Sequence, residues 1–505
     1  SPTHYFGLRE YSRCGHWGKN ALIRREGFWG NMMTDLINMI ATAVVGLLKS
    51  GEVSPSELLD ASEKRIAETN EAVNAIPTLC FGRARAHAAR LEREKPADRP
   101  EMHLHGLPIA VKDLTPVKGV RFTSGSPIFA DRIADYSDVM VERLEERGGI
   151  VVGKSNTPEF GAGGQTFNEV FGTTTNPWNT NLTPGGSSGG AASALAAGQV
   201  WLAQGSDLGG SLRTPASFTG IVGLRPSPKR IAHGPLGLPF STYPVEGPMA
   251  RNVPDTALFL DMMSGAHILD PSSLPAPETS YVDCLKDIPK FGRIAYSPDL
   301  GHCPVDPEVA EICAKAAEDF ARYCAGVDET CPDLHDAEEI FQTLRAQHFI
   351  ASHAPLLAQH RDKLKPEMIW NIEKGAKLNA DDIGAALRAQ GALYQRIVAF
   401  FSDYDFLLAP TAIVPPFSHS MRYVEEVSGV KFDNYMSWLA LPSMLTVTNC
   451  PVISIPCGFT KSGLPVGLQI MGPNAREDRV LQAAYAFERD HDFASRVPID
   501  PITPA

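Results

Sequence analysis

Hydrophobic residues recur along this chain with two different periods, and the changes of period predict alternating helices and strands. From Leu36 to Leu48 the apolar positions fall at i, i+4, i+7, i+8, i+11 and i+12, which predicts one amphipathic helix. This run is shorter than the roughly 20 apolar residues that a bilayer span needs. Ala41-Thr42-Ala43 resembles a signal-peptide cleavage site, but the apolar stripe continues through it. We therefore expect a cytoplasmic protein.

Capping residues predict where the next helices begin. Ser54-Pro55-Ser56-Glu57 combines a serine cap, a proline in the first helical position and a glutamate that closes a capping box. Helices are expected over residues 56–70, 83–93 and 138–147. Short apolar strands are expected over residues 105–113, ending on Lys112, and over residues 150–152.

Beyond Pro289 strand-like segments alternate with long helical ones. The strand-like segments are GRIAYS (292–297), FLLAPTAI (406–413) and VISIPCG (452–458), and the helices are expected over 307–322 and 381–401. This alternation predicts an α/β layered fold. Length alone is compatible with two to four domains. Residues 1–31 show no clean period, and we treat them as an N-terminal extension without an assigned function.

Composition and charge narrow the classes of function. The chain has 505 residues, 43% of them hydrophobic, and a formal net charge of −12. A negative balance argues against binding to nucleic acid or to an anionic membrane, both of which require a positive field. The nine cysteines occur without C-x-x-C pairs, and no H-E-x-x-H motif is present. We expect free thiols in a reducing compartment and no zinc site.

Gly148 to Ser155 reads GGIVVGKS and fits the phosphate-binding pattern G-x-x-x-x-G-K-[ST]. That loop requires a strand before it and a helix that begins at the Lys-Ser pair, whereas here a predicted helix precedes the match. Ile150, Val151 and Val152 favour extended backbone, and Pro158 disfavours a helix directly after Ser155. The sequence therefore predicts a strand here, with no nucleotide bound.

Gly185 to Gly189 reads GGSSG and fits G-x-S-x-G, the nucleophile elbow of α/β-hydrolases. An elbow follows a strand, but the preceding segment NPWNTNLTP consists of turn-forming residues. None of the later histidines stands in an evident catalytic motif. The nucleophile elbow is therefore the weaker interpretation of Gly185 to Gly189.

Three residues in separate stretches suggest a different chemistry. Ser211 follows Leu208-Gly209-Gly210, whose glycines permit a turn that directs backbone N–H groups at one point, as in an oxyanion hole. Lys112 ends an apolar strand, where burial disfavours the cation; a pKa near 7 instead of about 10.4 requires about 4 kcal/mol. Ser187, flanked by glycines, is placed to relay a proton. The alternatives are helix caps for both serines and a solvent-exposed ion pair of Lys112 with Asp113.

These stretches closely resemble the amidase signature family. The resemblance runs from about Ser54 to Gly472 and includes LHGLPIAVKDL, VVGKSNTPEFG, FGTTTNPWN, TPGGSSGGAASALAAG, GSDLGGSLRTPASFTGIVGLRPS and NCPVISIPCG. It implies a single α/β/α domain over residues 32–505, built on a central twisted mixed β-sheet surrounded by helices. The Ser/Gly motifs would lie within about residues 105–230.

The resemblance also implies roles for particular residues. The family uses a serine nucleophile, a serine that follows a cis peptide bond and a lysine base, which match Ser211, Ser187 and Lys112. The oxyanion hole would be formed by the backbone amides of Leu208, Gly209, Gly210 and Ser211, with supporting roles for Asp207, Arg213 and Ser188. No metal and no cofactor are implied.

The activity implied is hydrolysis of the C–N bond of a small linear amide through an acyl-enzyme, with no nucleic-acid or membrane partner. Two variable segments, 233–244 and 427–444, carry the large residues Phe240, Tyr243, Phe432, Tyr435, Met436 and Trp438. If these line the pocket, we expect bulky aryl or alkyl amides, and also carbamates and esters, to be substrates. The alternative is that they pack in the core or in a homodimer interface.

Two other functions are compatible with the sequence. The chain is also similar in its motifs to the glutaminase subunit of a tRNA-dependent amidotransferase, which works in a complex. A non-catalytic binding protein on the same fold is the second alternative. The presence of Lys112, Ser187 and Ser211 together argues against it.

Overall fold

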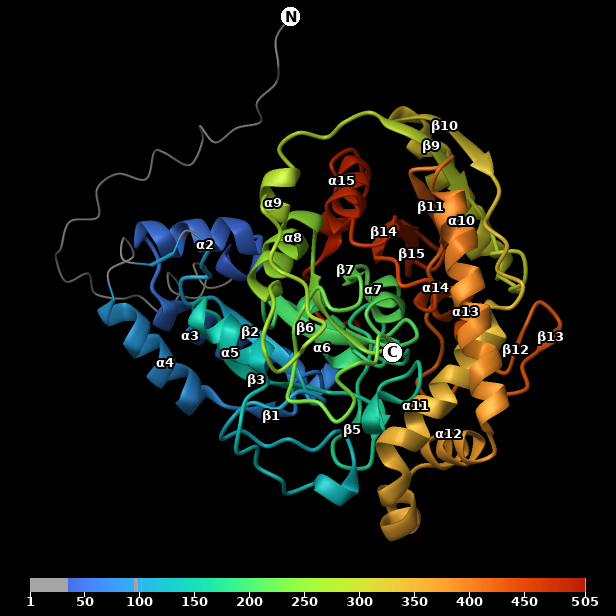
Figure 1. Cartoon of the computed structure of the whole chain (residues 1–505). Helices are drawn as coiled ribbons and strands as arrows, with labels where there is room; N and C mark the ends of the chain where they lie inside the picture. The colour runs from blue at the N-terminus through green and yellow to red at the C-terminus, as the bar shows by residue number, and fades with distance from the viewer. Residues whose placement is uncertain (1–34, 95–98, 101, 505) are drawn as a thin grey trace, which may run out of the picture.

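A large mixed β-sheet runs through the molecule and carries helices on both of its faces (Figure 1). The computed structural model describes residues 35–94, 99–100 and 102–504, so the expected N-terminal extension 1–31 lies outside the described residues. The predicted α/β class with a central mixed sheet is confirmed.

The sheet contains eleven strands in the order β1-β3-β2-β6-β8-β7-β14-β15-β11-β9-β10. Their bounds are β1 Thr78–Leu79, β2 Pro108–Lys112, β3 Ile150–Ser155, β6 Leu202–Asp207, β7 Val222–Arg225, β8 Val245–Ala250, β9 Phe291–Tyr296, β10 Cys324–Glu329, β11 Phe406–Pro410, β14 Val452–Phe459 and β15 Pro465–Met471. Strands β3, β2 and β6 are parallel to one another, as are β11, β9 and β10. The strands between these two groups pair antiparallel. Two small hairpins pair β4 Phe167–Asn168 with β5 Gly172–Thr173, and β12 Glu426–Val427 with β13 Val430–Lys431.

The helices of the described residues are α2 Ala41–Ser50, α3 Pro55–Val73, α4 Phe81–Arg93, α5 Val139–Glu146, α6 Gly189–Ala196, α7 Arg213–Thr219, α8 Val253–Met263, α9 Tyr281–Cys284, α10 Pro307–Asp319, α11 Ala337–His360, α12 Pro366–Ala376, α13 Ala380–Phe400, α14 Ala440–Thr446 and α15 Glu477–Glu488. Apart from the helix expected from Leu36 to Leu48, the expected helices and strands on both sides of Pro289 are present, with ends that differ by a few residues. Within the described part of the chain, none of them is both long and apolar enough to cross a bilayer.

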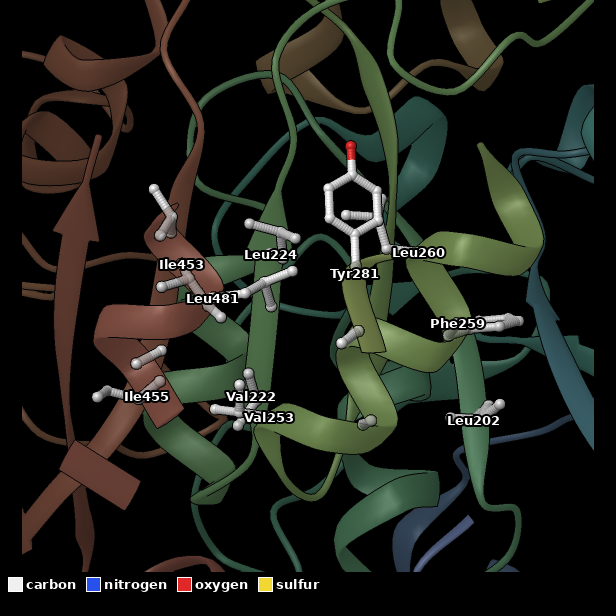
Figure 2. Close-up of a cluster of buried hydrophobic side chains, with 14 of the residues drawn as sticks. Leu202, Val222, Leu224, Val253, Phe259, Leu260, Tyr281, Ile453, Ile455 and Leu481 are labelled. Carbon is white, nitrogen blue, oxygen red and sulfur yellow. The ribbon is translucent and has the colours of Figure 1, made fainter. Parts of the chain in front are cut away.

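Alternation along the strands assigns side chains to the two faces of the sheet. Val222 and Leu224 of β7, with Ile453 and Ile455 of β14, belong to one core cluster, while Val452 of β14 belongs to another. This is the period of two expected when both faces of a sheet are buried. Figure 2 shows the first cluster, in which Val253, Phe259 and Leu260 of α8, Tyr281 of α9 and Leu481 of α15 lie over strands β6, β7 and β14. The second face is covered by α3, α4 and α6 at one end and by α11, α13 and α14 at the other.

Local sequence signals set the start of α3 as expected. Ser54 Oγ accepts a hydrogen bond from the Glu57 backbone N–H, and the Glu57 carboxylate accepts one from the Ser54 N–H at 2.9 Å. Pro55 occupies the first turn. The capping box predicted from Ser54-Pro55-Ser56-Glu57 is confirmed.

The prediction of one continuous helix from Leu36 to Leu48 is wrong. The backbone is not helical at Met39 and Ile40, and α2 begins at Ala41. Arg251 donates to the carbonyl oxygens of Ile37 and Met39 at 2.7 and 2.6 Å, and Asp255 accepts from the N–H groups of Ala41 and Thr42 at 2.7 and 2.8 Å. These distant charged groups satisfy the backbone where the helix is interrupted, a long-range effect that an apolar period does not report.

The GGIVVGKS segment is a strand, as the sequence predicts. Helix α5 ends before it, and β3 continues through Lys154 and Ser155. Lys154 Nζ is buried and lies 3.1 Å from Asp113 Oδ1. This pair uses the carboxylate of Asp113, so the alternative of a solvent-exposed Lys112–Asp113 pair is wrong.

Removing the Phe259 ring should destabilise the fold, because this side chain of α8 is fully buried in the core cluster. We expect Phe259→Ala to lower the free energy of unfolding by about 3–5 kcal/mol, measured by urea-induced unfolding followed by tryptophan fluorescence. Phe240, which is 75% exposed, provides the matched control. Phe240→Ala should change stability by less than about 0.5 kcal/mol. Equal effects of the two variants would contradict this assignment of the core.

Candidate active site

A buried lysine lies at the centre of a group of serine hydroxyls. Lys112 is the last residue of β2 and its side chain is fully buried. Lys112 Nζ lies 2.7 Å from Ser187 Oγ, 2.9 Å from Ser188 Oγ and 3.0 Å from Ser206 Oγ. Ser206 was not expected from the sequence, although it directly precedes Asp207 in the GSDLGGS stretch. The amine therefore has hydroxyl partners within hydrogen-bonding distance.

Burial changes the protonation of this amine. Desolvation lowers the pKa of Lys112 to about 7, and the carboxyl groups of Glu246 and Asp207 oppose that effect without cancelling it. Burial also raises the pKa of Glu246 to about 8, so this carboxyl group tends to hold its proton at neutral pH. Gln204 contacts both residues, because its Oε1 accepts from the backbone N–H of Lys112 at 2.8 Å and its Nε2 donates to Glu246. An uncharged lysine is thus accessible near neutral pH.

Glycines allow the Ser187 loop to approach its neighbours closely. The Gly186–Ser187 peptide bond is cis, as the family resemblance implies. A Cβ atom on Gly186 would lie 2.9 Å from the backbone of Gln165, and one on Gly190 would lie 2.3 Å from Asn156 N. Larger residues would push this loop away from Lys112. The preceding segment forms no strand of the sheet, which also rules out a nucleophile elbow here.

The helix-capping alternative fails for the serines. The Ser187 hydroxyl lies 2.7 Å from Lys112 Nζ and caps no helix. Helix α6 begins directly after Ser188, but the Ser188 side chain makes no capping hydrogen bond. Its hydroxyl instead donates to the Ser206 carbonyl oxygen at 3.1 Å. Helix α7 begins after Leu212, and Ser211 does not cap it. The hydroxyl groups are therefore available for interactions other than helix capping.

Ser211 lies in the turn between β6 and α7, beside the Ser187 loop. Gly210 adopts a positive φ of 115° in this turn. The Ser211 carbonyl oxygen accepts a hydrogen bond from the Ser188 N–H at 3.2 Å, which joins the two loops. Ser211 and Ser187 line the same cavity, and their hydroxyl groups form no hydrogen bond with each other in the described structure.

One of the four backbone amides expected in the oxyanion hole has another partner. The Gly210 N–H donates to Asp207 Oδ1 at 2.9 Å, because the Asp207 side chain folds back under the turn. The N–H groups of Leu208, Gly209 and Ser211 make no hydrogen bond within the described residues. Within the described residues, the N–H groups of Leu208, Gly209 and Ser211 thus remain without a protein acceptor, whereas that of Gly210 has one.

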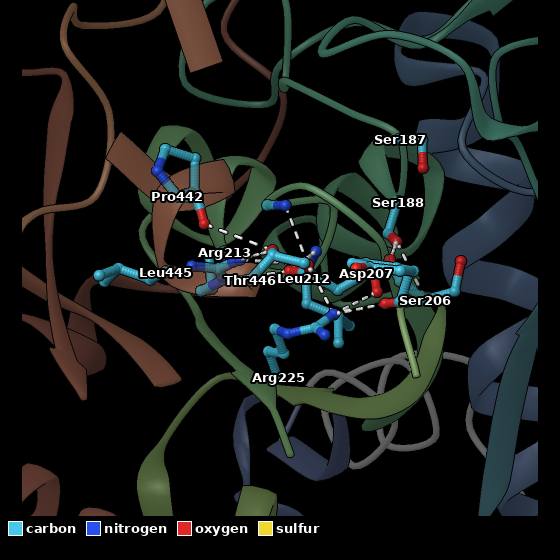
Figure 3. Close-up of polar contacts among 12 residues, drawn as sticks. Ser187, Ser188, Ser206, Asp207, Leu212, Arg213, Arg225, Pro442, Leu445 and Thr446 are labelled. Atoms are coloured by element: carbon cyan, nitrogen blue, oxygen red, sulfur yellow. Dashed lines mark hydrogen bonds and ion pairs between the residues drawn. The ribbon is translucent and has the colours of Figure 1, made fainter. Parts of the chain in front are cut away.

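Asp207 holds the turn through a buried ion cluster (Figure 3). Arg213 Nε lies 3.1 Å from Asp207 Oδ2, and Arg225 Nη1 lies 3.3 Å from Asp207 Oδ1, with all three side chains fully buried. Desolvation alone would raise the pKa of Asp207, but the two guanidinium groups hold it well below its ordinary value. Arg213 also donates to Gln469 and Thr446. The supporting positions expected at Asp207 and Arg213 thus fix the shape of the Ser211 turn.

The serines open onto a cavity of about 130 Å³. Its lining comes from Ser187, from Leu208, Gly209 and Ser211 of the turn before α7, from α11 and from the segment before α14. The lining residues outside the serine loops include Leu114, Phe160, Arg345, His348, Phe349, His353, Met436 and Leu439. Sequence patterns gave no indication of the α11 residues, because these lie on an ordinary amphipathic helix far along the chain.

A second cavity of about 460 Å³ adjoins the first. The two share Leu114, Phe160, Ser206, Pro244, His348 and His353 in their linings. The second cavity is also lined by Asp138, His233 and Glu246. Together the two spaces provide room on both sides of Ser206.

The large residues of the two variable segments divide between core and surface. Among those expected at the pocket only Met436 lines the first cavity. Tyr243, Tyr435 and Trp438 are buried in a core cluster, Phe432 is half-buried against it, and Phe240 is exposed. The core-packing alternative therefore describes most of these residues. In the described part of the chain, no group of three or more His, Cys, Asp or Glu side chains could hold a metal ion.

Two serines and a turn with free amides line one cavity, and a buried amine lies within hydrogen-bonding distance of one of the serines. This site is suited to acyl transfer. Comparison with known proteins agrees with this class. The Amidase family model matches residues 57–481. The chain therefore belongs to the amidase family, and it is an enzyme that hydrolyses amides at carbon–nitrogen bonds.

Individual relatives extend over nearly the whole chain. An acylamidase of Rhodococcus erythropolis is 36% identical over 469 residues, covering 92% of this chain and 98% of the relative. A glutamyl-tRNA(Gln) amidotransferase subunit of Synechococcus sp. (strain CC9605) is 33% identical over 480 residues, covering 89% and 96%. The crystal structure of a bacterial aryl acylamidase of the amidase signature family superposes with a TM-score of 0.84 at 27% identity, covering 91% of this chain and 99% of the other.

Neutralising Asp207 should destabilise the protein strongly. Asp207→Asn would leave the buried Arg213 and Arg225 without their shared carboxylate, so we expect a loss of about 3–5 kcal/mol in the free energy of unfolding. The control is Glu373→Gln, which removes one partner of an exposed ion pair with Arg361 and should cost at most about 1 kcal/mol. Urea titrations of the two variants beside the wild type make the comparison. A small effect at Asp207 would mean that the cluster does not hold the turn.

Proposed function

We propose that Ser211, Ser187 and Lys112 act as nucleophile, proton relay and base in the hydrolysis of linear amides. The observation that carries this proposal is the distance of 2.7 Å between Lys112 Nζ and Ser187 Oγ, in a cavity that Ser211 also lines. The buried position of the amine supports its role as a base, because burial favours the uncharged form. This is the lysine counterpart of a serine–histidine relay.

In the acylation step, neutral Lys112 accepts a proton from Ser187 as Ser187 accepts the proton of Ser211. The Ser211 oxygen attacks the carbonyl carbon, and the oxyanion is stabilised by the N–H groups of Leu208, Gly209 and Ser211. Loss of one such donor typically costs about 2.7–4 kcal/mol in the activation free energy. The C–N bond then breaks, and the proton returns through Ser187 to the leaving nitrogen, which departs as an amine.

Deacylation uses the same relay, with a water molecule in place of Ser211 as the nucleophile. A water molecule attacks the ester carbonyl of the acyl-enzyme and gives its proton to Lys112 through Ser187. The tetrahedral intermediate collapses, the carboxylic acid leaves, and Ser211 recovers its proton. The three residues therefore return to their starting protonation states after one turnover.

The substrates we propose are small amides with apolar substituents, including anilides, with carbamates and esters as further candidates. Phe160, Phe349, Met436 and Leu439 give the first cavity an apolar wall on which such groups can pack. The names of an acylamidase relative and an aryl acylamidase neighbour support this choice. The enlarged space of the second cavity supports a bulky group on one side of the scissile bond.

A second candidate function is that of the glutaminase component of a tRNA-dependent amidotransferase. The 33% identity to a glutamyl-tRNA(Gln) amidotransferase subunit favours it. Such a component would require partner chains and would prefer glutamine. The 36% identity to an acylamidase over 92% of this chain favours an independent amidase.

Replacing Ser211 should abolish both labelling and turnover. We expect Ser211→Ala to lower kcat/KM on a neutral 4-nitroanilide by about 10⁴-fold or more, and to prevent labelling by a fluorophosphonate. Ser193→Ala is the control, since Ser193 of α6 donates to the Thr175 carbonyl oxygen and does not line the cavity. Assaying the single purified chain with L-glutamine in parallel tests the alternative. Turnover of glutamine but not of the anilide would favour the glutaminase, and full activity of Ser211→Ala would refute the relay.

The activity should rise with pH across neutrality. The pKa of Lys112 is lowered to about 7, so the amine is mostly protonated below that pH and mostly neutral above it. Because the base must be neutral, kcat/KM should increase through a limb centred near pH 7, measured between pH 5.5 and 9. Lys365→Met is the control, because Lys365 is a half-buried lysine whose pKa is also lowered and whose amine donates to the Ala162 carbonyl. The limb should keep its position in that variant; a limb that moves with Lys365, or a decrease through pH 7, would exclude Lys112 as the base.

A further inference from the structure

Arg345 brings a buried positive charge to the cavity that contains Ser211. It lies on α11, is 3% exposed, and lines the cavity together with His348, Phe349 and His353 of the same helix. These positions are spaced at i, i+3, i+4 and i+8, so they share one helix face. Arg345 is thus part of the wall of the cavity that Ser211 also lines.

The partners of Arg345 are all uncharged. Its guanidinium donates to Asn371 Oδ1 and, at 2.8 Å, to the Tyr435 hydroxyl. It also lies 4.3 Å from the centroid of the Phe349 ring and 5.6 Å from that of Tyr435. Among the described residues, no carboxylate lies within 4.0 Å of it.

Other buried arginines of this protein are compensated differently. Arg213 and Arg225 share Asp207, and Arg230 lies 3.2 Å from Glu477. A buried guanidinium without a counter-ion is costly, so proteins normally pair it. Arg251 is also buried without a paired carboxylate, but it donates to the backbone carbonyls of Ile37 and Met39 and lines neither cavity. Arg345 has neither kind of partner and lines a cavity, where a ligand is able to supply the missing charge.

The guanidinium retains unused hydrogen-bond donors. Arginine carries five N–H groups, and Arg345 engages its Nη1 and Nη2 atoms once each with protein acceptors. Its Nε–H has no hydrogen bond within the described residues. A planar fork with free donors matches the geometry of a carboxylate, which accepts two parallel hydrogen bonds.

Two histidines near Arg345 are uncharged near pH 7, and two carboxylates near it are paired with other arginines. Burial lowers the pKa of His348 and of His353 to about 4, so both rings are neutral near pH 7. Asp207 is neutralised by its two arginines. Glu367 pairs with Arg422 away from the cavity lining. The cavity therefore presents one uncompensated cation to whatever it binds.

We propose that Arg345 binds a carboxylate of the substrate, so that the preferred substrates are amides carrying a carboxylate a short chain away from the scissile carbonyl. Monoamides of short dicarboxylic acids are the chemical class. This inference rests on the proposed function, since it requires Ser211 as the nucleophile in the same cavity. The volume of about 130 Å³ limits the chain to a short one. The carboxylate replaces the missing counter-ion, and the apolar wall packs against the methylene groups.

A pair of matched anilides tests the proposal. N-succinyl-4-nitroaniline carries a terminal carboxylate, and N-(4-methylpentanoyl)-4-nitroaniline carries an isopropyl group of similar shape in its place. We expect the wild type to show a kcat/KM ratio of at least about 10 in favour of the succinyl compound. In Arg345→Met this ratio should fall by about 10- to 100-fold, the range expected for a charge-assisted hydrogen bond. Arg345→Lys should restore part of the ratio, because it keeps the charge but not the fork.

Lys374→Met provides the matched control. Lys374 is a half-buried cation whose amine lies 5.0 Å from the Trp370 ring centroid, and it does not line the cavity. Removing it should leave the ratio within about twofold. A parallel fall of kcat/KM for both anilides in Arg345→Met would show a structural role and overturn the proposal.

The ratio of kcat/KM values for the two anilides, measured on the wild type alone, also tests whether the protein binds a substrate carboxylate. A ratio below one refutes carboxylate binding even if Arg345→Met fails to fold. Failure of the proposed function is distinguishable, because the wild type would then hydrolyse neither anilide. Activity on the neutral anilide with no preference for the succinyl compound would leave the relay intact and reject the role of Arg345.

Discussion

A lysine amine withheld from water is the constraint on which this active site depends. Lys112 is fully buried at the end of β2, and its Nζ has three serine hydroxyls within 3.0 Å. An ammonium ion would lose its hydration there, whereas a neutral amine requires only hydrogen-bond partners. The glycine-rich loops that carry Ser187 and Ser211 meet this requirement by packing more closely than larger residues allow.

The carboxylates near Lys112 form ion pairs with other cations and not with its amine. Asp207 lies nearby, but Arg213 and Arg225 take up its charge and also fix the turn before α7. Asp113, the neighbour of Lys112 in sequence, pairs with Lys154. The ion pairs therefore give the site its rigidity, while the amine keeps partners without charge. Arg345 differs from these arginines because it faces the cavity without a carboxylate.

Predictions from the sequence succeeded where the cause is local. The capping box at Ser54 depends on side chains within one turn, and the strand in GGIVVGKS follows from β-branched residues flanked by a helix end. Predictions failed where a distant group intervenes. Arg251 and Asp255 bind the backbone groups where the expected helix is interrupted at Met39.

The sequence by itself determined the α/β class and the residue types of the serine and lysine motifs, since period, caps and glycine spacing are properties of neighbouring residues. Only the tertiary structure decided which surfaces meet. An amphipathic pattern predicts that one face of α11 is buried. It does not predict that Arg345 and His348 line the same cavity as Ser211. Likewise, the partners of Lys112 depend on how β2, β6 and the loop before α6 pack together. Long-range packing sets these contacts, and no local pattern encodes them.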